Sequence, residues 1–287
     1  MKKFVTITAI VLVIAVCDLA LTYNGFMVNS DYFVKNDFEI TRSAHSEKTW
    51  DRVFFGNSAV SAAYIEGQNG GGYVNLGIDE GTVTDLRTMI DRRFINIGSE
   101  LLIGLSGQTL YDGIERNTEY IWYKKLYEPY VYFERARLLP ALKSAAERLR
   151  KKEAPLLDEY ISQSKAVYRG AMPRRAAEAA AAEYAEIYSD VTAESFEENI
   201  SALEDIIKYC NENDIRVRVV WMPWNGAFEK PEAFDAARAA AEEVLGEYNV
   251  ETLDLENAFE SGGFYDAEHL NYDVGSPEFT QLIDEWQ

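Results

Sequence analysis

The sequence predicts a three-layer α/β domain, in which helices cover both faces of a parallel sheet, preceded by one apolar N-terminal helix. Strand-like apolar runs, such as residues 53–55 and 101–105, alternate with segments such as 82–94 whose apolar residues recur at helical spacing. Such alternation is typical of a parallel sheet. The 287 residues are 47% hydrophobic, which is enough for one core of roughly 200 or more residues.

The first element is an apolar run from Phe4 to about Tyr23, preceded by Lys2 and Lys3. About 20 apolar residues are enough for a helix to cross a bilayer, and lysines before the run favour retention of that end in the cytoplasm. The run is longer than a typical signal-peptide core, and no clear small-residue cleavage site follows it. Residues 1–23 are therefore expected to anchor the chain in the cytoplasmic membrane, with the rest outside.

Residues 24–48 mix polar and aromatic side chains and are interpreted as a juxtamembrane linker, which leaves residues 49–287 for the α/β domain. The formal net charge of -20 excludes nucleic acid as a natural partner, since the phosphate backbone would be repelled. Cys17 and Cys210 are expected to form no disulfide. The two histidines have no metal-ligand spacing around them, so no metal and no other cofactor is predicted.

The first strand of the domain ends in Gly56, Asn57 and Ser58, and residues 59–64 can begin a helix. Ser58 is therefore expected at a helix N-terminus, at the carboxyl edge of the sheet, where backbone N–H groups stabilise negative charge. This position suits a nucleophile. The alternative is an ordinary serine that caps the helix.

Near the other end of the chain, His269 follows Asp266 by three residues in a loop flanked by glycines. A carboxylate at this spacing can orient an imidazole as the base that deprotonates a serine. The alternative is a solvated histidine in a polar loop.

Together, Gly-Asn-Ser at 56–58 and Asp-x-x-His-x-Asn at 266–271 resemble the SGNH hydrolases, also called GDSL-type hydrolases. The resemblance implies a flavodoxin-like three-layer fold, with Ser58 as nucleophile, His269 as base and Asp266 as its orienter. It also implies an oxyanion hole that contains the backbone N–H groups of Ser58 and of Gly77, which ends the predicted second strand.

The sequence departs from this family at two places. The family's Gly-x-Asn-Asp block is replaced by Gly-Leu-Ser-Gly-Gln at 104–108, so Gln108 or Ser106 is expected to replace the asparagine as the third oxyanion donor. Asn57 stands where the family usually has aspartate, as in its surface-polymer branches. Four residues at predicted strand ends are expected to contact substrate: Asn57, Ser106, Trp224 and Asn225.

Residues 111–192 interrupt the strand–helix alternation with an aromatic segment and then with basic, alanine-rich helices. This helical insertion is a candidate cap that holds a glycan or an anionic polymer, or that meets lipid headgroups or a partner protein. The alternative is a solvated helix pair that packs its tyrosines and leucines on the core.

A serine near the start and Asp-x-x-His near the end also resemble the membrane-anchored D-alanine transfer protein and polysaccharide O-acylation proteins. The resemblance implies an extracytoplasmic esterase or acyltransferase that acts on ester-linked acyl groups of a cell-surface polysaccharide or an acylated carrier, beside a membrane-bound acyltransferase. Two alternatives stay open: a non-catalytic anchored partner of such a system, and a simple lipase or esterase.

Overall fold

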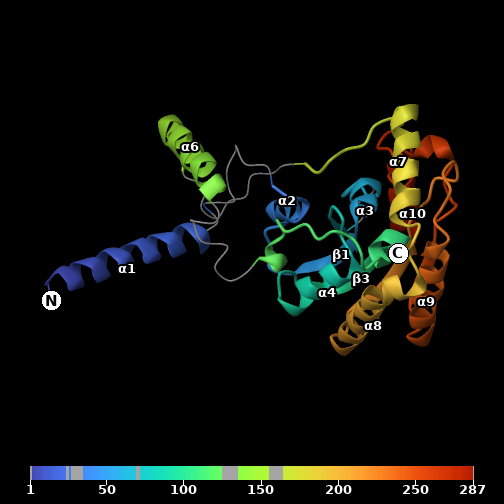
Figure 1. The fold of residues 1–287 in the computed structure, drawn as a ribbon, viewed down its shortest axis with the longest axis horizontal. Helices are drawn as coiled ribbons and strands as arrows, with labels where there is room; N and C mark the ends of the chain where they lie inside the picture. The colour runs from blue at the N-terminus through green and yellow to red at the C-terminus, as the bar shows by residue number, and fades with distance from the viewer. Residues whose placement is uncertain are drawn as a thin grey trace. The chain divides into compact units, whose positions relative to one another are not determined.

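The computed structural model describes residues 2–23, 26, 35–68, 72–124, 135–154 and 164–286 (Figure 1). The chain divides into two compact units. One comprises Met1–Ser46 and Thr118–Ser164, and the other comprises Glu47–Asn117 and Lys165–Gln287. The helical insertion expected at 111–192 is therefore shared between the units, and only its middle part belongs with the N-terminal segment.

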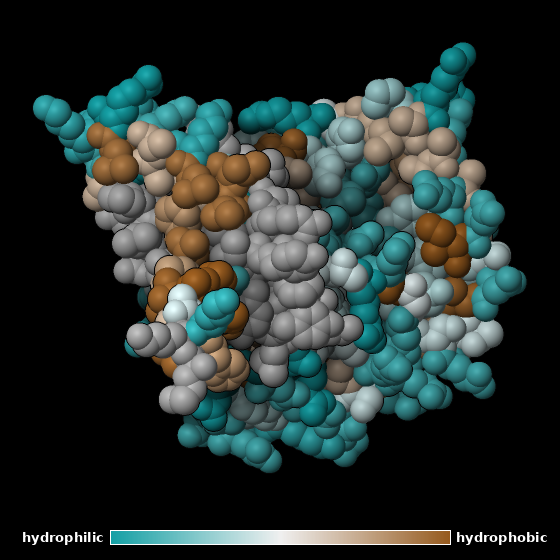
Figure 2. Space-filling model, turned by 60° about the vertical axis from the view of Figure 1, so that its left-hand side comes forward, coloured by the Kyte–Doolittle hydropathy of each residue, from teal (hydrophilic) through white to brown (hydrophobic). Residues whose placement is uncertain are grey.

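The first unit contains the apolar helix α1 (Lys2–Tyr23). Its side chains are open to the surface, with Phe4 75% and Leu12 65% exposed. Figure 2, in which the α1 side of Figure 1 is turned forward, shows hydrophobic residues exposed at this surface. By length and composition α1 can cross a membrane, and a signal sequence has the same properties.

Three further helices complete the described part of the first unit. These are α2 (Asp37–Ala44), the short 3-10 helix η1 (Ile121–Tyr123) and α6 (Arg135–Lys151). Helix α2 begins with a capping box between Asn36 and Glu39. The same Glu39 forms an ion pair with the buried Arg137 of α6, so α2 and α6 are joined by a charge-assisted contact.

The second unit is built on a five-stranded parallel sheet, which confirms the predicted fold class. The strands are β1 (Trp50–Gly56), β2 (Tyr73–Gly77), β3 (Ile97–Leu105), β4 (Arg216–Trp221) and β5 (Glu251–Asp254). Their order, β2-β1-β3-β4-β5, is the flavodoxin-like doubly wound order. The register places Phe55 beside Leu76 on one side and Ile103 on the other, so the carboxyl ends of β1, β2 and β3 meet at one edge.

Helices cover both faces of this sheet. The helices of this unit are α3 (Ser58–Ala63), α4 (Val83–Asp91), α5 (Gly107–Leu110), α7 (Arg174–Ile187), α8 (Glu197–Glu212), α9 (Ala233–Glu247) and α10 (Gly275–Glu285), with the 3-10 turns η2 (Ala193–Phe196) and η3 (Ser261–Gly263). Helices α3 and α10 contact each other and share a core with Phe54, Leu102 and Val220. Helix α8 contacts both α4 and α9, and these three cover the opposite face (Figure 1).

A buried charged cluster lies at the amino ends of the strands, away from the edge where the predicted site residues emerge. Arg218 of β4 is fully buried and pairs with Glu100 of β3 at 2.5 Å. Glu100 also accepts the Tyr73 hydroxyl at 2.8 Å and pairs with Arg52 at 3.0 Å. Burial raises the pKa of Glu100, but the Tyr73 hydrogen bond and the Arg218 charge outweigh it and lower the pKa overall. This cluster ties four strands together, since Arg52 lies in β1 and Tyr73 in β2.

Candidate active site

Ser58 is the first residue of helix α3, directly after the end of β1. The helix is capped by Asn57, whose Oδ1 accepts the Ala59 N–H at 3.0 Å. Ser58 itself is therefore not the capping residue, and its hydroxyl stays available for another role. In the described part of the chain the Ser58 N–H has no hydrogen-bond partner, as expected at the first turn of a helix.

His269 lies beside this serine although 211 positions separate them in the sequence. Its Nε2 is 2.8 Å from Ser58 Oγ, and its Nδ1 is 2.8 Å from Asp266 Oδ2 and 3.0 Å from Oδ1. Because the carboxylate can only accept, Nδ1 carries the proton and Nε2 is left to accept the serine O–H. The structure thus brings Ser58, His269 and Asp266 into one hydrogen-bonded chain.

The loop that carries Asp266 and His269 is held from two sides. Within the loop, Asp266 Oδ1 accepts the backbone N–H groups of Glu268 at 3.0 Å and His269 at 2.8 Å. From the loop after β4, Asn225 Nδ2 donates to Asp266 O at 2.9 Å, and the Asn225 N–H donates to Ala267 O at 2.9 Å. Asn225, expected to contact substrate, instead fixes the loop of the acid and the base.

The electrostatic environment of the Ser58, His269 and Asp266 series favours a strong base at His269. Burial lowers the pKa of the imidazole, but the hydrogen bond and negative charge of Asp266 outweigh it, so the pKa of His269 is raised. Burial raises the pKa of Asp266, yet the hydrogen bonds and charge of His269 lower it overall. Tyr168 stacks on the imidazole with ring centroids 4.5 Å apart. The ring is therefore held in place as well as polarised.

A cavity of about 520 Å³ opens beside Ser58. Helix α7, which belongs to the predicted insertion, supplies part of its wall through Ala180, Glu183, Tyr184 and Ile187. The other lining residues are Asn57, Ser58, Glu80, Gly81, Gln108, Tyr111, Gly113, Ile114, Glu115 and Tyr188. The cavity is thus bounded by the sheet edge on one side and by tyrosine rings and α7 on the other.

Gly77 does not present a free N–H to this cavity. It lies inside β2, and its N–H donates to Asn75 Oδ1 at 2.9 Å, which corrects the oxyanion role expected for it. The physical reason for a glycine here is close packing: a Cβ atom would lie 2.2 Å from the Ser61 backbone nitrogen. Gly77 lets helix α3 approach β2.

Glu80 was not singled out from the sequence. It lines the cavity, has a positive φ of 54°, and its N–H has no hydrogen-bond partner within the described part of the chain. A left-handed conformation is uncommon for a residue with a side chain, and Arg93, Lys152, Asp214 and Asn249 also adopt it in this chain. No sequence signal marks this position, because glutamate is not a residue that favours this conformation.

Gln108 lines the cavity with Ser58 and is held at both ends of its amide. Its Oε1 accepts from Asn57 Nδ2 at 3.2 Å, and its Nε2 donates to the Tyr184 hydroxyl. An amide nitrogen carries two hydrogens, and Gln108 also forms a side-chain hydrogen bond with Tyr188, which opposes the rise that burial causes in the pKa of Tyr188. Asn57 also lines the cavity, but it is buried and serves both the helix cap and Gln108.

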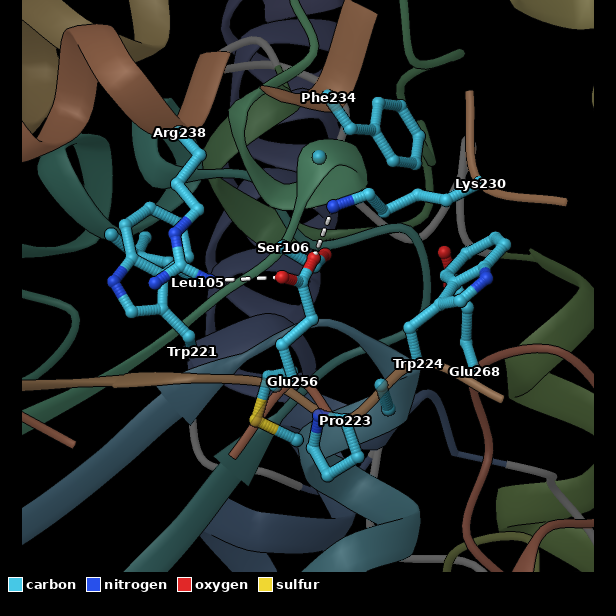
Figure 3. A pocket seen from close by; sticks show the side chains of 13 residues that line it. Leu105, Ser106, Trp221, Pro223, Trp224, Lys230, Phe234, Arg238, Glu256 and Glu268 are labelled. Carbon is cyan, nitrogen blue, oxygen red and sulfur yellow. Dashed lines mark hydrogen bonds and ion pairs between the residues drawn. The ribbon is translucent and has the colours of Figure 1, made fainter. Parts of the chain in front are cut away.

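Ser106 and Trp224 lie elsewhere. Ser106 caps the short helix α5, where its Oγ accepts the Thr109 N–H at 3.3 Å. Trp224 donates its Nε1–H to Phe228 O at 3.0 Å. Both line a second cavity of only about 20 Å³ (Figure 3), room for about one water molecule. The structure therefore does not place either beside Ser58.

Figure 3 shows Glu256 in this second cavity, between two cations of the surrounding elements. Lys230 pairs with it at 2.7 Å and Arg238 at 2.9 Å. Glu268 lies at the same cavity, beside Trp224, and its carboxyl is not part of this ion-pair network.

No group of three or more His, Cys, Asp or Glu side chains is placed to hold a metal ion within the ranges that the structure describes. Both cysteines are free thiols: Cys17 is exposed on α1, and Cys210 is buried in α8.

No protein-family profile and no curated protein matches the sequence of this chain. Among solved structures, a protein of Bacteroides fragilis NCTC 9343 assigned as an acylhydrolase aligns with 88% of this chain and 99% of its own length, at 11% identity and a TM-score of 0.41. A protein of Parabacteroides merdae ATCC 43184 assigned as a GDSL-like lipase aligns over 83% and 94%, at 13% identity and a TM-score of 0.30. Similarity at these values does not bear on function.

Proposed function

We propose that the protein is a serine-dependent ester hydrolase or acyltransferase of the SGNH type. The observation that carries this proposal is the hydrogen-bonded chain from Ser58 through His269 to Asp266, at 2.8 Å for each of its two links. Ser58 lines a cavity that is large enough for a small ester or one sugar unit.

The geometry supports a two-step acyl transfer. Ser58 Oγ attacks the ester carbonyl while its proton passes to His269 Nε2, and the negative charge moves to the carbonyl oxygen. When the carbon–oxygen bond breaks, His269 returns the proton to the leaving alcohol and the acyl group stays on Ser58. Water or an acceptor hydroxyl then enters by the same steps in reverse, so one fold serves both hydrolysis and transfer.

The negative oxygen needs hydrogen-bond donors that are already in place. The unpaired N–H groups of Ser58 and Glu80 are donors that the described residues offer at this cavity. Asp266 keeps the imidazole in the right tautomer and stabilises it once it is charged.

We further propose that this chemistry acts on ester-linked acyl groups of a cell-surface polysaccharide, outside the membrane in which α1 anchors the chain. Support comes from the exposed apolar surface of α1, from the lysines before it, and from a cavity wall built by an insertion. An acylated carrier and a membrane-bound acyltransferase are the partners that fit such a role.

A second candidate is a non-catalytic partner protein in the same kind of system. It is favoured by one observation: Gly77 and Gln108, the donors expected to complete the oxyanion hole, both have hydrogen-bond partners inside the protein.

A fluorophosphonate probe separates the two candidates. The proposed enzyme should be labelled on Ser58, and labelling should be lost in Ser58→Ala and His269→Ala, with turnover reduced on the order of 10⁴-fold or more. Ser61→Ala is the matched control, because Ser61 lies in the same helix and its hydroxyl makes no hydrogen bond among the described residues. Absence of labelling in the folded native protein would favour the non-catalytic partner.

A second assay tests the substrate. Faster release of acyl groups from acylated glycans than from short esters would support the polysaccharide substrate over a simple esterase.

A further inference from the structure

Helix α6 (Arg135–Lys151) presents leucine side chains to its surroundings. Leu139, Leu142 and Leu149 are 73%, 49% and 63% exposed, and Ala146 between them is exposed as well. Spacings of three and seven residues place these four side chains on one face of the helix, which we call the leucine stripe. Single exposed leucines are ordinary, but apolar side chains gathered on one face mark a surface that contacts a partner or a lipid bilayer.

The adjoining face of α6 already has a partner. Ala141 forms a small core with Phe26, and Leu138 and Ala145 pack against this core together with Leu21 of α1. The contact therefore joins α6 to the carboxyl end of α1, where the anchor proposed above leaves the bilayer. The leucine stripe lies beside this core and takes no part in it.

Helix α6 is basic, although the chain as a whole is acidic. Six of its residues are basic and one, Glu147, is acidic, whereas the formal net charge of the chain is -20. Lys143 and Arg150 are exposed and follow members of the leucine stripe by four residues, so they border it. A helix with apolar side chains on one face and lysines or arginines along the border of that face is typical of the interface of an anionic bilayer.

We propose that α6 lies along the membrane surface beside α1, with the leucine stripe at the boundary between headgroups and acyl chains and its basic border against anionic lipid headgroups. The inference rests on α1 as the membrane anchor and goes beyond the proposed acyl chemistry, which it does not require. It gives the first unit two contacts with lipid, one that crosses the bilayer and one that lies in its outer surface.

Two other occupants of the leucine stripe match these observations less well. An anionic glycan would match the charge of α6, but it would leave the three leucines in contact with water. A second copy of this chain would cover the leucines, but it would bring two basic borders together, and like charges repel. An anionic lipid surface suits both the apolar and the basic side chains of α6.

Quenching by spin-labelled lipid tests this placement on the full-length chain in nanodiscs that contain phosphatidylglycerol. In a Cys17→Ser background the remaining Cys210 is buried, so a single introduced cysteine can carry an NBD fluorophore. Leu142→Cys and Leu149→Cys place this label on the leucine stripe. Both labels should be quenched roughly 2-fold or more by a nitroxide near the headgroups, because an interfacial helix buries its apolar face at that depth.

Two further labels serve as controls. Leu12→Cys, at an exposed position in α1, reports whether the anchor is inserted and should be quenched by a nitroxide deep in the acyl chains. Ala182→Cys, at an exposed position on α7, lies outside the leucine stripe and gives the level of quenching without the proposed contact.

Charge variants test the basic border. Lys143→Gln combined with Arg150→Gln should lower the ratio of lipid-bound to free α6 roughly 10- to 30-fold, because each lysine or arginine at an anionic surface contributes about a 5-fold factor. Arg174→Gln combined with Arg175→Gln on α7 is the matched control, since it removes the same charge from exposed positions elsewhere, and it should leave the quenching unchanged. Thermal unfolding verifies that each variant is folded.

Labels on α6 that stay at the level of the α7 label, while the α1 label is quenched, would overturn the inference and leave the anchor intact. Equal quenching in nanodiscs of phosphatidylcholine alone would also overturn it, and so would an NBD response to dextran sulfate, an anionic polymer, without a response to lipid. An unquenched α1 label would show that α1 is not an anchor, and the inference would fail with it. Fluorophosphonate labelling of Ser58 decides the acyl chemistry separately.

Discussion

Substitution of Gly77 by alanine distinguishes a packing role from an oxyanion role. Alanine keeps the backbone N–H, so an oxyanion donor at this position would survive the change. A Cβ atom at Gly77, however, would lie 2.2 Å from the nitrogen and 2.5 Å from the Cα of Ser61. These are backbone atoms that cannot rotate away, so helix α3 must move away from β2.

The cost can be worked out from this contact. Overpacking a core typically costs about 1–3 kcal/mol, and the rigid backbone contact places Gly77→Ala at about 3 kcal/mol. For a unit of this size, about 1 kcal/mol corresponds to roughly 2–4 °C in Tm, so Tm should fall by roughly 6–12 °C. A shift of α3 also moves Ser58 away from His269, and a displacement of about 1 Å can cost on the order of 100-fold in rate.

Thermal unfolding and fluorophosphonate labelling measure the two effects. The matched control is Gly246→Ala in helix α9, where a Cβ meets nothing within 4 Å. Because alanine favours a helix over glycine by up to about 1 kcal/mol, this control should keep or raise Tm. A native Tm for Gly77→Ala would refute the packing argument.

Three further predictions concern the base, the charged cluster and the apolar helix. Since Asp266 raises the pKa of His269 against the effect of burial, and the base must be neutral to act, kcat/KM should fall as pH drops through a value above about 6.5. Asp266→Asn should move this acidic limb to lower pH, and a native limb at or below about 6.5 would contradict the assignment. Arg218→Ala removes the fully buried cation beside Glu100, which keeps Arg52 and Tyr73 as partners, and should cost about 3 kcal/mol in urea unfolding, the lower end for a broken buried pair. Because the pKa of Glu100 is lowered in the folded state, this stabilisation is present at neutral pH and should shrink as pH falls below about 4.5. The full chain should stay with membranes after carbonate extraction and be digested by protease added to intact cells, whereas a soluble secreted form lacking residues 2–23 would show that α1 is a signal sequence.

The parallel sheet and the Ser58, His269 and Asp266 site could be predicted from the sequence because they depend on regular patterns. Apolar runs of strand length, separated by segments with helical spacing, are enough to predict parallel strands. Parallel strands bring their carboxyl ends to one edge, so Ser58 after β1 and the loop after β5 were expected to converge there. This topology brings Ser58 and His269 to the same edge, where they lie 2.8 Å apart.

The hydrogen bonds that surround the triad could not be predicted from the sequence, because each polar group has several possible partners nearby. Asn75 folds back to take the Gly77 N–H, and Ser106 turns to the backbone of its own helix. Such local side-chain hydrogen bonds compete with other hydrogen bonds of the same groups. The spacing of apolar residues does not indicate which of them forms. The position of α7 is a similar case. None of its described side chains is buried, so its pattern does not indicate which surface it covers.

These local hydrogen bonds have a common effect at the carboxyl edge of the sheet, where they fix the residues of the site. Asn57 caps α3 and also holds Gln108, while Asn225, in the loop after β4, holds the loop of Asp266. Side chains that looked like substrate contacts therefore serve to fix the groups that react. Preorganised donors and bases reduce the reorganisation that an acyl transfer would otherwise require, and each such contact draws its rigidity from a strand end or a helix cap. The residues that give this site its specificity should therefore be sought on the cavity wall formed by α7, where Ala180, Glu183 and Ile187 line the cavity and none of the described side chains is buried.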